Sequence, residues 1–69
     1  MTKSDATIVR DFSLEAITKL SSALIVCQER GSKTDFERMR LAVAHAMGHI
    51  SSGILTPIYA EYPDLDHLK

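Results

Sequence analysis

The chain has 69 residues, of which 45% are hydrophobic and 25% charged, and its net charge is −1. This composition is typical of a folded globular protein and excludes extensive disorder. The near balance of 8 basic and 9 acidic residues excludes a general electrostatic field that would attract nucleic acid or an anionic membrane.

Small size is the main constraint on stability. A domain of this length buries only about 60% of its unfolded surface, and Cys27 is the single cysteine, so no intrachain disulfide can form. We therefore expect one helical domain over 1–69 that gains stability by self-association. The longest apolar run, 23–27, is far shorter than the roughly 20 residues of a membrane helix, and no signal-peptide core is seen at the N-terminus. We expect a cytoplasmic protein with no membrane segment.

The first predicted element is an amphipathic helix over about 6–30, because no glycine or proline precedes Gly31. Its apolar positions recur at helical spacing. They are Val9, Phe12, Ala16, Leu20, Ala23, Leu24 and Cys27. Two starts stay open: Ser4 or Asp5 caps a helix that runs through, or Ser13 caps a helix that begins at residue 14.

A short loop is predicted after residue 30. Gly31 stands where a glycine in the left-handed conformation ends a helix. Thr34 and Glu37 have the spacing of a capping box, in which each side chain accepts from the other residue's backbone amide. So short a loop predicts either an antiparallel hairpin or a sharply angled helix pair.

The second predicted helix covers about 35–55. Its apolar stripe consists of Phe36, Met39, Val43, Ala46, Met47, Ile50 and Ile54. A second stripe beside it consists of Leu41, Ala44, Gly48, Leu55 and Tyr59. Gly48 costs a helix roughly 1 kcal/mol relative to alanine, so it indicates either a close helix crossing or a loosened helix.

Pro57 predicts a kink or break between Ser51 and Pro57, because its ring clashes with the carbonyl four residues earlier. Thr56 would cap a short third helix over 57–61. The helix phase keeps Ile50, Ile54 and Ile58 on one side. Tyr62 precedes Pro63 and is biased away from helix, which leaves 63–69 as a tail.

Two histidines are the candidate metal ligands. His45 and His49 lie four residues apart on one helix face, the spacing with which two imidazoles chelate a transition metal. The third ligand would come from another helix, from His67 or from a second copy. The alternative is a pair of ordinary solvated histidines. Cys27 lies on the apolar stripe near a helix C-terminus, where the dipole disfavours the thiolate, and is expected to be a structural thiol.

No catalytic constellation and no cofactor motif occur in the sequence, so we expect a protein that is not an enzyme and needs no cofactor. A DNA-binding helix pair is disfavoured because 35–37, Asp-Phe-Glu, would face phosphate. The C-terminal residues alternate acidic with apolar side chains, which is typical either of a docking segment or of a solvated end.

These observations predict an all-α protein: an antiparallel helical hairpin with a short third helix, forming a helical bundle by homo-oligomerisation, with a dimer favoured. The expected function is a non-catalytic protein-binding or regulatory module. The alternatives are a metal-binding protein that uses His45 and His49, and a nucleic-acid-binding hairpin. The residues expected at the oligomer or partner interface are Leu41, Met47, Gly48, Leu55, Tyr59, Tyr62 and Leu65.

Overall fold

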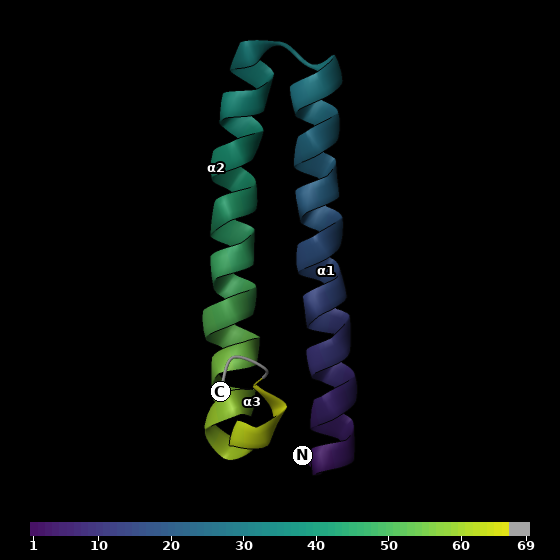
Figure 1. The fold of residues 1–69 in the computed structure, drawn as a ribbon. Coiled ribbons are helices and arrows are strands. Elements are labelled where there is room, and N and C mark those ends of the chain that lie inside the picture. Colours follow the sequence, from purple (N-terminus) through teal and green to yellow (C-terminus); the bar gives the residue numbers. More distant parts are fainter. Residues whose placement is uncertain (67–69) are drawn as a thin grey trace.

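The computed structural model describes residues 1–66 (Figure 1). Over that range every regular element is helical, which confirms the all-α prediction. The elements are α1 (Lys3–Arg30), α2 (Lys33–Ile50), the π-helical turn η1 (Ser51–Leu55), α3 (Thr56–Glu61) and the 3-10 turn η2 (Pro63–Leu65).

Two long helices lie side by side and run in opposite directions (Figure 1). Only Gly31 and Ser32 separate the end of α1 from the start of α2, and a connection this short returns the chain along the helix it has just left. The chain is elongated, with extents of 44 × 21 × 15 Å. The N-terminus and α3 lie at the end of the molecule opposite the loop (Figure 1).

The first helix begins earlier than predicted, at Lys3. Its cap is Thr2, whose Oγ1 accepts a hydrogen bond from the Asp5 amide at 3.1 Å. The alternative of a helix that runs through is therefore confirmed, with its cap at Thr2 in place of Ser4 or Asp5, and the start at Ser13 is wrong. Ser13 lies inside the helix and is buried, and its hydroxyl donates to the Val9 carbonyl at 2.8 Å. This bond lets the small polar side chain sit in the interior without an unpaired group.

Gly31 ends α1 as predicted, but for a different reason. Its backbone is extended, with φ −91° and ψ 171°, and is not left-handed. Its amide donates to the Cys27 carbonyl at 2.9 Å. A Cβ at this position would lie 2.8 Å from the same carbonyl oxygen. The turn therefore needs glycine for close approach, and not for its freedom of φ.

The capping box predicted at Thr34 and Glu37 is wrong, because α2 already begins at Lys33. The cap is Ser32, whose Oγ accepts from the Asp35 amide at 3.1 Å. The sequence contains the same kind of capping signal two residues before Thr34. There Ser32 is followed after three residues by the acidic side chain of Asp35.

The interruption predicted between Ser51 and Pro57 is confirmed, although the chain stays helical as it crosses Pro57. Between α2 and α3 it forms the π turn η1, in which the Thr56 amide donates to the Ser51 carbonyl five residues back. A π turn is wider than an α turn. The extra residue accommodates the proline ring, which would clash with the Gly53 carbonyl in a regular helix. Thr56 is not a cap; its hydroxyl also donates to the Ser51 carbonyl, at 2.9 Å.

The extra residue in η1 also changes which side chains point inward. Leu55 and Ile58 are buried, with 6% of each residue exposed, whereas Ile54 is 38% exposed. The prediction that Ile54 continues the inner row of Ile50 is therefore wrong, because Leu55 takes that place. A pattern read at about 100° per residue cannot anticipate the shift.

The C-terminal segment packs against the N-terminus. Tyr62 leaves the helix as predicted, with φ −129° and ψ 78°. The turn η2 then folds back, and Leu65 is buried in a cluster with Ala6 and Ile58. The prediction of a tail from Pro63 is therefore wrong for 63–65; residues 67–69 lie outside the described range. Val9, Tyr59 and Tyr62 pack around this cluster.

The Ser32 cap can be tested by mutation. Replacing Ser32 with alanine leaves the Asp35 amide without its acceptor, and we expect the free energy of unfolding to fall by about 1 kcal/mol. Thr34→Ala is the control, since Thr34 lies within α2, where alanine is the better helix former. Urea denaturation measures both. A larger loss for Thr34→Ala would restore the helix start at Thr34.

Candidate functional site

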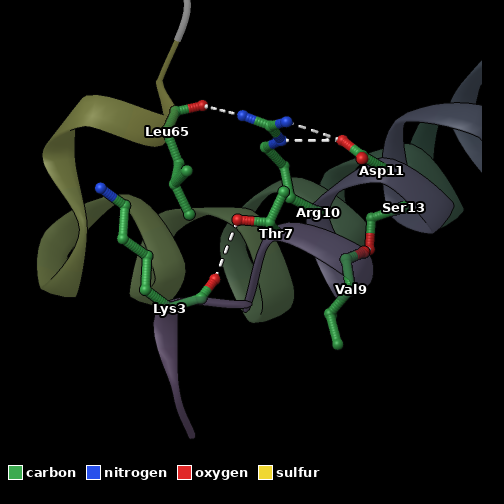
Figure 2. Close-up of polar contacts among 7 residues, drawn as sticks. All are labelled: Lys3, Thr7, Val9, Arg10, Asp11, Ser13 and Leu65. Atoms are coloured by element: carbon green, nitrogen blue, oxygen red, sulfur yellow. Dashed lines mark hydrogen bonds and ion pairs between the residues drawn. The ribbon is translucent and has the colours of Figure 1, made fainter. Parts of the chain in front are cut away.

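A polar clasp holds the C-terminal turn on α1 (Figure 2). The Arg10 side chain, 11% exposed, donates from Nη1 to the Leu65 carbonyl at 2.9 Å and from Nη2 to Asp11 Oδ1 at 2.8 Å. A guanidinium presents several donors in a fixed plane, so one side chain satisfies a backbone carbonyl and a carboxylate together. Arg10 therefore fixes the place of Leu65 in the cluster.

Two further contacts join the ends of the described chain. Lys3 pairs with Asp64, and the Tyr62 hydroxyl donates to the Met1 carbonyl at 2.7 Å. The hydrogen bond from Lys3 lowers the pKa of the Asp64 carboxyl below its ordinary value. Because both side chains of this pair are more than half exposed, it stabilises the fold less than the half-buried Arg10 contact does.

Several of the residues predicted to form an interface pack within the single chain, and their role in an interface stays a prediction. Leu55 and Leu65 belong to the chain's own interior, while Met47, Tyr59 and Tyr62 are half-buried. The exposed members are Leu41, at 55%, and Gly48. A charge introduced at Leu55 would therefore disrupt the folding of the single chain before it reported on association.

The candidate metal ligands are both on the surface of α2. His45 and His49 are exposed. Within residues 1–66, no group of three or more histidine, cysteine, aspartate or glutamate side chains is arranged to hold a metal ion. His67, the third ligand considered from the sequence, lies outside that range. A metal site on His45 and His49 stays a prediction. Cys27, the remaining candidate considered from the sequence, is a half-buried free thiol.

The predicted apolar stripe of α1 is wider than the surface that α2 covers. Leu20, Leu24 and Cys27 are half-buried, but Phe12 is 68% exposed and Ala23 is also exposed. The prediction that Phe12 packs in the hairpin seam is therefore wrong. Four apolar residues share one side of α1, because they follow one another at spacings of three, four and seven residues. They are Val9, Phe12, Ala16 and Ala23. This row borders the seam on one side.

A matching row lies on α2 and η1. It consists of Met39, Ala42, Ala46, Gly53 and Ile54, of which all but Ala46 are exposed. Val9 and Ile54 line one hollow, so the two rows lie on the same side of the hairpin. We call them together the Phe12 face. Lys19 and His49 lie along its edges.

The opposite side of the hairpin has a different character. A second hollow there is lined by Leu14, Ile17, Leu55 and Tyr59, together with the polar residues Ser51, Thr56 and Asp66. Hydroxyl groups on this side already donate within the helices, as Ser21 does to the Ile17 carbonyl at 3.1 Å. The Phe12 face thus combines exposed apolar side chains with small residues, although exposed apolar side chains also lie elsewhere on the hairpin, at Ile25, Val26 and Leu41.

The folded chain exposes more surface than a compact protein of its size. Its solvent-accessible area is 5018 Å², whereas about 4,300 Å² is expected for this mass. Its radius of gyration is 14.4 Å, against roughly 11 Å for a compact chain of this length. The excess, about 700 Å², is close to the roughly 800 Å² that each partner contributes to a standard protein interface.

None of the described helices combines the length and the apolar character needed to cross a membrane. Comparison with known proteins adds no relative: no family model, no curated protein and no solved structure matches the chain.

The role of Arg10 in the clasp gives a direct prediction. Arg10→Ala removes a charged donor from the Leu65 carbonyl and should lower the free energy of unfolding by about 1.5–3 kcal/mol. Arg38→Ala is the matched control, because Arg38 is 70% exposed and pairs only with Asp35, at 3.2 Å, in the described structure. It should change stability by less than about 0.5 kcal/mol. Equal effects in urea denaturation would show that the clasp is as weak as a surface ion pair.

Proposed function

We propose that this chain is a non-catalytic, homo-oligomeric helical protein that acts by binding other proteins, and that its first partner is a second copy of itself. The single observation that carries the proposal is the excess exposed area of about 700 Å² relative to a compact chain. Two hairpins that pack through their Phe12 faces form a four-helix bundle, which is the usual way for amphipathic hairpins to complete a core.

The distribution of apolar side chains supports the same arrangement. Phe12 is 68% exposed, and Met39 and Ile54 are each 38% exposed, all on one face. Between them lie Ala16 and Ala46, whose small side chains allow the backbones of two helices to approach closely. Contiguous exposed apolar surface of this kind is typical of protein interaction sites.

A symmetric dimer also accounts for the thin interior of the single chain. Among the described residues, the buried apolar side chains are Ala6, Val43, Leu55, Ile58 and Leu65. All of these except Val43 lie near the start of α1 or in the segment from η1 to η2. Small domains commonly obtain the missing stability from oligomerisation. A regulatory role would follow from the bundle's outer surface, which presents side chains such as Leu41 to a further partner.

Sedimentation velocity at low micromolar concentration tests the proposal. We expect the unmodified chain to sediment as a dimer, and Phe12→Glu to raise the dimer dissociation constant at least tenfold by placing a charge in the apolar contact. Circular dichroism should show an unchanged fold, because Phe12 contributes little to the interior of the single chain.

Ile25→Glu is the matched control for this experiment. Ile25 is also an exposed apolar residue of α1, at 52%, but helical spacing places it on the side away from Phe12. Its substitution should leave the dimer intact. A compact monomer at every concentration, or equal loss of the dimer in both variants, would contradict the proposal.

A further inference from the structure

A hollow of about 350 Å³ lies within the Phe12 face, at the end where the chain termini meet. Its walls come from the first turns of α1, through Ala6 and Val9, and from η1 and α3, through Ile54 and Ile58. Glu61 and Tyr62 also line it. The volume falls within the roughly 300–1,000 Å³ of pockets that take in whole ligands.

One residue in the wall of the hollow is a glycine. Gly53 lines it, and a Cβ added there would have no heavy atom within 4 Å. A glycine in a helix costs roughly 1 kcal/mol relative to alanine. In the loop after α1 the close approach of Gly31 to the Cys27 carbonyl explains that glycine, but among the described residues no such contact explains Gly53 or Gly48. The open space beside Gly53 is thus available to something outside the chain.

Phe12 is placed to enter such a space on a second copy. It lies one helical turn beyond Val9, which lines the hollow, and its ring is 68% exposed. In a two-fold dimer each contact occurs twice, so residue i of one copy touches residue j of the other and the reverse. A two-fold axis that passed α1 near these residues would set each Phe12 against the partner's hollow.

We propose that the hollow lined by Val9, Gly53 and Ile54 is the socket for the Phe12 ring of a second copy of this chain. The inference rests on the proposed self-association and identifies its central contact. The occupant is a second copy because Phe12 lies on the same face as the hollow, and because the excess exposed area equals about one side of a standard interface. Aromatic rings seated in desolvated pockets commonly dominate the energy of such interfaces.

Fluorescence can follow this contact because the chain contains no tryptophan. Phe12→Trp introduces one indole, whose emission moves to shorter wavelength when it leaves water. We expect the emission of dilute protein to be that of exposed indole, and to shift with rising concentration along the same curve that sedimentation gives for the dimer.

A pair of glycine substitutions supplies the matched test of the socket. Gly53→Leu fills the hollow, whereas Gly48→Leu adds the same side chain to α2 outside the Phe12 face, and neither site has a heavy atom within 4 Å of the new Cβ. Both changes favour helix, so thermal denaturation should show that both variants fold. In the Phe12→Trp background, Gly53→Leu should raise the dimer dissociation constant at least tenfold, and Gly48→Leu less than twofold.

The outcomes separate this inference from the proposed function. A dimer whose indole emission stays that of exposed indole, or that is insensitive to Gly53→Leu, would overturn the socket and leave self-association standing. A monomer at every concentration would overturn both. Short-wavelength emission that does not depend on concentration would place the ring against its own chain or a small bound molecule, and would also overturn the socket.

Discussion

Two packed helices share a single seam, and each can bury only the side chains that face it. This constraint governs the whole chain. The helix α1 is 28 residues long, yet its apolar arc is wider than the surface that α2 covers, so Leu20 and Leu24 are half-buried while Phe12 and Ala23 stay exposed. Three or more helices around a common axis are needed to enclose such an arc. In the proposed dimer a second hairpin would supply two more.

The π turn and the polar clasp determine how the seam ends. The extra residue of η1 turns Leu55 inward and leaves Ile54 at the surface. Beyond it, α3 reverses into η2, where Arg10 holds the Leu65 carbonyl. Together these features close one end of the seam around Ala6 and Ile58, and the hollow on the Phe12 face lies against the same closed end. The fold's most tightly packed region and its candidate contact site are thus built by the same residues.

The sequence predicts the all-α class, the stop at Gly31 and the departure of Tyr62 from helix, because each depends on local backbone chemistry. It misplaces the start of α2, since two overlapping signals, at Ser32 and at Thr34, each satisfy the local rules. It also assigns Phe12 to the interior, because a broad apolar arc does not reveal which edge meets the partner helix. The burial of Leu65 could not be inferred, since it depends on an arginine 55 positions away.

The clasp has a consequence for biosynthesis. Ala6 emerges from the ribosome well before Leu65, by about 3–12 s at roughly 5–20 residues per second. At the loop end of the hairpin, the contacts join residues that are close in sequence and can form early. The cluster of Ala6, Ile58 and Leu65 joins residues that are far apart in sequence and forms late. The hollow is bounded by Ile58 and Glu61, so it does not exist on a nascent chain that has only just completed α2. Any ligand or partner of the hollow would therefore meet it only on a chain whose synthesis has passed α3.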